Sequence, residues 1–94
     1  MLKEELLQET AKIGWQELQR FFANGSTVYV APELDLIDVA WEICQDNKAK
    51  IEAWMADGQV GQVSDEQALA WLETDALVWS VVVKPWVLVQ PVSN

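Results

Sequence analysis

The apolar residues follow a helical spacing over most of the chain. In five segments they recur at intervals of three and four residues, which places them on one face of an α-helix, with charged side chains opposite. Single glycines or polar turns separate these segments, and Ser64 and Gln67 have the spacing of a capping box at the start of the last one. The predicted helices are 2–13, 15–24, 34–45, 47–56 and 64–75.

Three other segments are typical of strands. Thr27–Val30 is β-branched and aromatic, a short β-like piece lies near Gln59–Val63, and Val78–Val89 is almost continuously apolar. We expect the last segment to form one strand, bent at Pro85. Because 94 residues leave room for one core, the sequence predicts a single α+β domain over 1–94. Four to five helices would pack on a small, mostly antiparallel sheet of two to three strands.

The C-terminal run from Val81 to Gln90 is apolar on both faces of a strand. Side chains alternate between the faces, so such a strand must be covered on both sides, by helices or by another subunit. Six tryptophans add more bulk than so small a core hides easily. These features favour a homodimer, and the residues expected at its interface are Trp79, Val81, Val83, Trp86 and Leu88.

The net charge of the chain bears on which kinds of molecule it can bind. Fifteen acidic and six basic residues give a net charge of −9, which argues against binding to nucleic acid or to an anionic membrane. The excess of acid is most simply a solubility device. The alternative is an acidic decoy or inhibitor of a basic protein, which requires the carboxylates to lie on one continuous face.

The sequence also bears on the cellular compartment. Cys44 is the single cysteine, so no internal disulfide can form, and the N-terminal segment lacks the apolar core of a signal peptide. The apolar run from Ala76 to Val89 is shorter than the roughly 20 residues of a spanning helix. We expect a soluble, cytoplasmic protein.

The residue types exclude several chemistries. The chain has no histidine, which rules out Ser-His and Cys-His nucleophilic catalysis within one chain type, and its four glycines form no phosphate-binding loop. We expect no cofactor. Asp35, Asp38 and Glu42 lie on one face of the third predicted helix and could ligate a hard cation. A solvated helix face explains the same spacing more simply.

Lys84 is the second candidate for chemistry. A lysine desolvated by apolar neighbours could serve as a Schiff-base amine, whereas a lysine at a bend can lay its stem over apolar surface and keep its ammonium in water. The leading hypothesis is a non-enzymatic interaction or assembly protein. The alternative is a small-ligand-binding protein or enzyme with a tryptophan-lined pocket that uses Lys84 and a carboxylate.

Four segments together resemble one known family. They are ETAKIGWQELQRFFANG (9–25), DNKAKIEAW (46–54), VSDEQALAWL (63–72) and VVVKPWVLVQ (81–90). They resemble the short bacterial proteins grouped as domain of unknown function 2288, and the resemblance covers nearly the whole chain. It implies a bacterial source and a small stand-alone protein. It transfers no catalytic residue.

Overall fold

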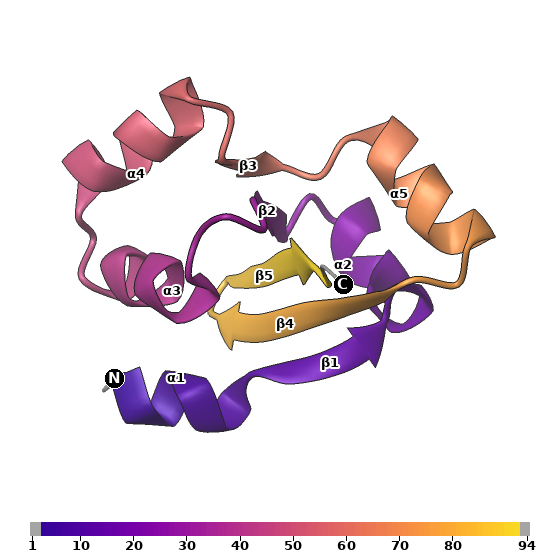
Figure 1. Cartoon of the computed structure of the whole chain (residues 1–94), viewed down its shortest axis with the longest axis horizontal. Coiled ribbons are helices and arrows are strands. Elements are labelled where there is room, and N and C mark those ends of the chain that lie inside the picture. Colours follow the sequence, from indigo (N-terminus) through magenta and orange to yellow (C-terminus); the bar gives the residue numbers. More distant parts are fainter. Residues whose placement is uncertain (1–2, 93–94) are drawn as a thin grey trace.

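A five-stranded mixed sheet with helices on both faces organises residues 3–92, which are the residues that the computed structural model of the chain describes (Figure 1). The strand order is β1-β4-β5-β2-β3; β2 and β5 run parallel and the other neighbours antiparallel. The elements are α1 (Lys3–Glu9), β1 (Ala11–Gly14), the 3-10 helix η1 (Trp15–Leu18), α2 (Gln19–Ala23), β2 (Thr27–Val30), α3 (Leu36–Cys44), α4 (Lys48–Ala56), β3 (Val60–Gln62), α5 (Asp65–Glu73), β4 (Leu77–Val83) and β5 (Trp86–Pro91).

The α+β class is confirmed, and the expected number of strands is wrong. β2 and β3 lie where the composition predicted them. Residues 78–89, expected as one bent strand, instead form the antiparallel hairpin of β4 and β5, in which Val83 pairs with Trp86. The turn consists of Lys84 and Pro85, joined by a cis peptide bond. A proline has no N–H to give to a ladder, so it is accommodated better in this turn than within a paired strand.

β1 is the second departure from the sequence pattern. Residues 11–13 fit the spacing of the first predicted helix, but α1 ends at Glu9, and the Thr10 hydroxyl donates to the carbonyl of Leu6 over 2.7 Å. Ala11–Gly14 then pairs with β4 along its outer edge. This pairing gives hydrogen-bond partners to backbone N–H and C=O groups of both strands, and it packs Ile13 against buried apolar residues.

The apolar side chains form two cores, one on each face of the sheet. We call the side of the sheet covered by α1, α3 and α4 the first face, and the side covered by η1, α2 and α5 the second face. The first core consists of Leu6, Val30, Leu36, Val39, Ala40, Val60, Val81, Val83 and Leu88. The second consists of Trp15, Leu18, Val63, Ala68, Val78, Val87 and Val89.

The cover that β5 requires is supplied by the chain itself. Leu88 belongs to the first core, whereas Val87 and Val89 belong to the second. Both edges of β5 are also occupied, by β4 and by β2. The apolar character of both faces of this strand is therefore explained without a second subunit.

Side-chain caps fix where three helices begin. Ser64 Oγ accepts a hydrogen bond from the backbone N–H of Gln67 over 3.1 Å, as the capping-box spacing predicted. Asp35 caps α3 by accepting from the N–H of Ile37, and Asn47 caps α4. None of the helices within residues 3–92 has the length and apolar character needed to cross a bilayer.

Candidate functional site around Trp86

Five of the six tryptophans have an aromatic or cationic partner within the chain. Trp15 and Trp71 meet edge to face in the second core, with ring centroids 4.9 Å apart. A lysine ammonium lies over each of three further rings, at 5.0–5.9 Å from the centroid, an arrangement that stabilises a partly exposed indole. These pairs are Lys3 with Trp41, Lys50 with Trp54, and Lys12 with Trp79.

Trp86 differs from the other five. Trp86 is the first residue of β5, and its side chain lies on the first face of the sheet. The residue is 40% exposed. Within the described part of the chain, no aromatic ring or cation is paired with its indole. Large aromatic side chains that are exposed at concave surfaces are typical anchors of binding sites.

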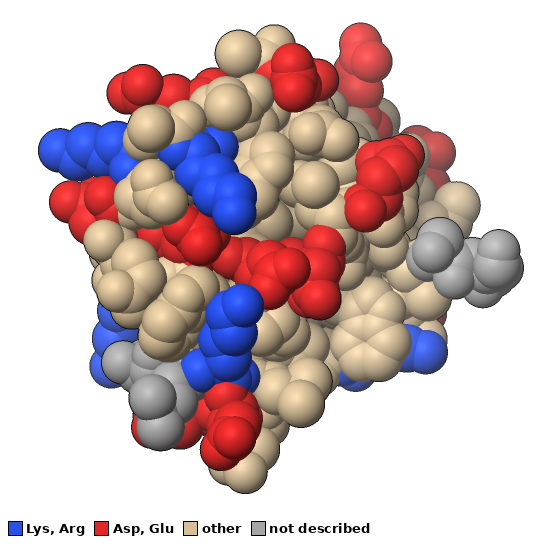
Figure 2. All heavy atoms as spheres, turned by 60° about the vertical axis from the view of Figure 1, so that its left-hand side comes forward, with Lys and Arg blue, Asp and Glu red and all other residues tan. Residues whose placement is uncertain are grey.

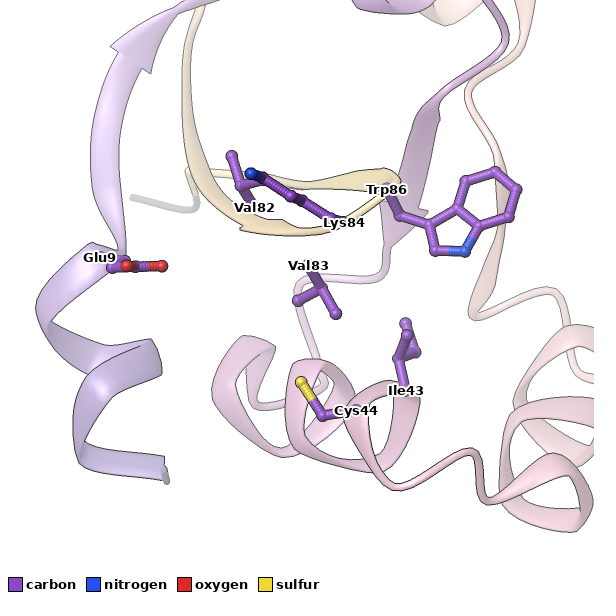
Figure 3. A pocket seen from close by; sticks show the side chains of 7 residues that line it. All are labelled: Glu9, Ile43, Cys44, Val82, Val83, Lys84 and Trp86. Atoms are coloured by element: carbon purple, nitrogen blue, oxygen red, sulfur yellow. The ribbon is translucent and has the colours of Figure 1, made fainter. Parts of the chain in front are cut away.

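A hollow of about 560 Å³ lies on one side of Trp86, and we call it the Lys84 hollow (Figure 3). Ile43 and Cys44 point into it from the end of α3, and the Lys84 side chain extends over it from the hairpin turn. Glu9, at the end of α1, is its carboxylate. In residues 3–92, Lys84 makes no ion pair with a carboxylate. The complete lining is Glu9, Ile43, Cys44, Val82, Val83, Lys84 and Trp86.

A second hollow of about 350 Å³ lies on the other side of Trp86, between α4 and the strands β2, β3 and β5. We call it the α4 groove. Its wall is mostly apolar, and Asp46 is the one charged residue among those that line it. Ile43 and Trp86 line both hollows, so the two side chains lie between them. The lining of the α4 groove is Val28, Ile43, Asp46, Ile51, Met55, Val60, Gly61, Gln62 and Trp86.

The predicted acidic stripe lies outside both hollows. Asp35 caps α3, and Asp38 pairs with the Lys3 ammonium over 3.0 Å. Glu42 accepts a hydrogen bond from Asn47 Nδ2 over 2.6 Å. The carboxylate beside Lys84 is therefore Glu9 and not a member of the stripe. Within residues 3–92, no group of three histidine, cysteine or acidic side chains is arranged to hold a metal ion.

Replacing Asp38 with asparagine tests whether the acidic stripe binds a metal ion or only forms ion pairs and caps on the surface. The Lys3–Asp38 pair is about half exposed on both sides, and exposed pairs contribute about 0–1 kcal/mol. We expect Asp38→Asn to lower the free energy of unfolding by less than about 1 kcal/mol in urea titrations. Lys3→Gln should cost somewhat more, because it also removes the ammonium over the Trp41 ring, and the double variant should be no worse than Lys3→Gln alone. A rise in melting temperature with magnesium or calcium that Asp38→Asn abolishes would instead indicate a metal site.

The five residues expected at a dimer interface do not form one surface. Val81, Val83 and Leu88 are buried in the first core beneath α1 and α3, so they cannot contact a partner in this structure. Trp79 and Trp86 are exposed, but they lie at opposite ends of the hairpin, across from Gln90 and Val83 respectively. The sequence singled out these positions because the segment is apolar on both faces of a strand, and it carried no information about which positions the helices cover.

The acidic residues are spread over the molecule. Asp38 and Glu42 lie on α3, which covers the first face, whereas Asp65 and Glu66 lie on α5, which covers the second. Figure 2 shows acidic, basic and uncharged side chains interspersed on the face it displays. Acidic side chains therefore lie over both faces of the sheet, and in the view of Figure 2 basic and uncharged side chains separate them.

Sequence and structure comparisons are consistent with one another. Residues 1–91 match the family described as "Protein of unknown function (DUF2288)". The solution NMR structure of PA1075 from Pseudomonas aeruginosa is similar, with 43% sequence identity and a TM-score of 0.86. The match covers 95% of this chain and 82% of PA1075. No curated protein matches the chain.

Proposed function

Because the chain belongs to the DUF2288 family of proteins of unknown function, its role has to be inferred from its surface, and we propose that it is a non-enzymatic interaction protein. It binds a protein partner through Trp86 and the two hollows beside it. The observation that carries this proposal is the exposed indole of Trp86, which lacks an aromatic or cationic partner among residues 3–92 and joins two concave surfaces. Aromatic residues of this kind dominate the energetics of protein interfaces.

The surroundings of Lys84 support binding over catalysis. The lysine lies in an exposed turn, so it lacks the apolar burial that activates a Schiff-base amine. Its hollow nevertheless favours a second candidate, the binding of a small ligand, because Lys84 and Glu9 present opposite charges to the same space. A zwitterionic molecule would match that pair of charges.

Self-association is a separate prediction. Both edges of β5 are paired, so a dimer cannot form by adding a strand to β5 and would use exposed side chains such as Trp86 or an edge strand of the sheet. The net charge of −9 on each copy opposes the approach of a second copy. We therefore favour a different protein as the partner. We also propose a cytoplasmic location, since the single cysteine has no partner for an internal disulfide.

The experiment compares variants of the full chain as bait in affinity capture from a bacterial lysate. Trp86→Ala should lose the partner, with a weakening of about thirtyfold, because removal of an interface anchor costs about 2 kcal/mol. Trp79→Ala is the matched control, since Trp79 is 37% exposed against 40% for Trp86 and lies outside both hollows. Lys84→Met should keep the partner, because it retains most of the apolar stem.

Three other outcomes would redirect the proposal. Equal capture by the Trp86→Ala and Trp79→Ala variants would remove Trp86 from the interface. Recovery of the chain itself, with a dimer in sedimentation that Trp86→Ala dissociates, would favour homodimerisation. Trapping of a carbonyl compound on Lys84 by borohydride at neutral pH would favour the enzyme hypothesis.

A further inference from the structure

We propose that the partner is an extended, basic segment of a protein that adds a strand to the sheet along the outer edge of β3, beside Trp86. This inference rests on the proposed function and specifies the conformation and the charge of the partner. Its basis is the combination of an open, uncharged sheet edge with an apolar groove on the same face.

The outer edge of β3 presents free backbone groups. β3 is the last strand of the order, and Figure 1 shows no element beyond it. The N–H of Ala31 donates to the carbonyl of Gln59 over 2.8 Å, so the carbonyl of Gln59 points inward, toward β2. Backbone groups alternate in direction along a strand. The N–H and C=O groups of Val60 and Gln62 therefore point outward, where a further strand would pair with them.

The two edges of the sheet differ in how they discourage such pairing. β1, the opposite edge strand, carries Lys12 among its four residues, and a charged side chain is a common protection of an edge. β3 has the sequence VGQ and continues on either side with Gln59 and Val63, so residues 59–63 contain no charge. This edge lacks the charged protection that β1 has.

The groove lies on the side of β3 where a partner's side chains would reach it. Val60 and Gln62 pair with Val30 and Val28, and all four positions belong to the first face. In an added strand, every second side chain would project toward the same face. Those side chains would lie next to the apolar wall of the α4 groove, which includes Met55 and Trp86. Main-chain bonds would then provide affinity, and the groove would select the side chains.

Charge favours a basic partner. Asp46 is the charged residue of the groove, and the chain as a whole carries a net charge of −9. Complementary charge speeds association and orients the partner, an effect that salt screens over about 8–10 Å. Lysine or arginine residues that flank the apolar positions of the partner would match this field.

The test begins with random peptides of about twelve residues displayed on phage and selected on the intact protein, a length that suffices for one added strand. The selected sequences should carry net positive charge and apolar residues at every second position. A synthetic copy of the best peptide then serves as the probe for binding measurements and for hydrogen exchange. Its binding should slow exchange of the Val60 and Gln62 amides.

Gln62→Pro is the decisive variant, because proline removes an N–H that points away from β2 and leaves the β2–β3 pairing intact. It should weaken binding of the peptide by at least about fivefold, the equivalent of one hydrogen bond. Gln62→Ala loses the same groove side chain but keeps the N–H, so it should bind the peptide about fivefold more tightly than Gln62→Pro, and the difference between the two variants isolates the backbone hydrogen bond. Circular dichroism and thermal melting would verify the fold of both variants.

The outcomes separate this inference from the proposed function. If Trp86→Ala abolishes binding while Gln62→Pro does not, the Trp86 surface stands and the added strand is wrong. Selection of helical or acidic peptides would also overturn the added strand. If Gln62→Pro does not fold, the hydrogen-exchange measurement decides instead, and unchanged exchange of the Val60 and Gln62 amides on peptide binding would overturn the added strand. If no binding peptide is selected, or if neither variant affects the peptide, the added strand is wrong, and capture with Trp86→Ala decides the proposed function separately.

Discussion

Trp15→Ala is expected to lower the free energy of unfolding by about 3–5 kcal/mol, the range for removing a large aromatic side chain from a core. Trp15 is fully buried, and its ring meets those of Phe22 and Trp71 at centroid distances of 5.8 and 4.9 Å. The alanine variant would leave these two rings around a cavity and loosen the attachment of η1 to the second face. Domains of this size have about 5–15 kcal/mol of stability, so the loss should be plain in urea titrations followed by circular dichroism.

Two control variants show whether the loss comes from burial. Trp79→Ala should cost no more than about 2 kcal/mol, because Trp79 is partly exposed and contributes less buried area. Trp15→Phe should cost less than Trp15→Ala, since it retains an aromatic ring and sacrifices no hydrogen bond. The Trp15 Nε1 atom has no hydrogen-bond partner among the residues described. Equal losses for Trp15→Ala and Trp79→Ala would contradict the arrangement of the second core.

Local signals in the sequence were sufficient for most of the helices and for two strands. The apolar spacing of α3, α4 and α5 and the cap at Ser64 are properties of neighbouring residues, and the structure forms these elements close to the predicted bounds. Thr27–Val30 was likewise recognisable from its β-branched and aromatic composition. In these segments the preferences of the local sequence and the requirements of the fold agree.

The remaining strands depend on partners that are remote in sequence. Residues 11–13 fit a helix when judged by spacing alone, and their pairing with β4, near the other end of the chain, is what makes them a strand. Pro85 is compatible with either a bend or a turn, so a single bent strand and the β4–β5 hairpin could not be distinguished locally. The parallel pairing of β2 with β5 has no signal in either segment.

The sequence predicted only those residues of the candidate site that stand out from their neighbours in the chain. Trp86 and Lys84 were identifiable because they interrupt or follow an apolar run. Ile51 and Met55 gave no such sign, since they are ordinary apolar positions of a helix and gain significance only where α4 approaches Trp86. Glu9 likewise becomes the carboxylate nearest to the Lys84 hollow only because α1 ends there. Periodicity identifies which side chains are apolar, but not which of them remain uncovered.

Leu88→Ala is expected to lower the free energy of unfolding by about 2–5 kcal/mol, whereas Trp86→Ala should cost no more than about 2 kcal/mol. The two residues lie on the same face of β5, two positions apart. Leu88 is fully buried opposite Val81 in the first core, and Trp86 is 40% exposed beside the two hollows. Urea titrations of both variants under identical conditions would measure the difference.

This difference decides whether Trp86 can be interpreted as a binding residue. If Trp86→Ala remains folded and loses its partner, the loss reflects a missing contact and not unfolding, because the core around Leu88 is intact. Leu88→Ala provides the opposite reference: it should reduce partner capture only under conditions in which the variant is itself unfolding. Should Trp86→Ala destabilise the chain as strongly as Leu88→Ala, the indole would belong to the core in solution. The proposed interaction surface would then lose the observation that supports it.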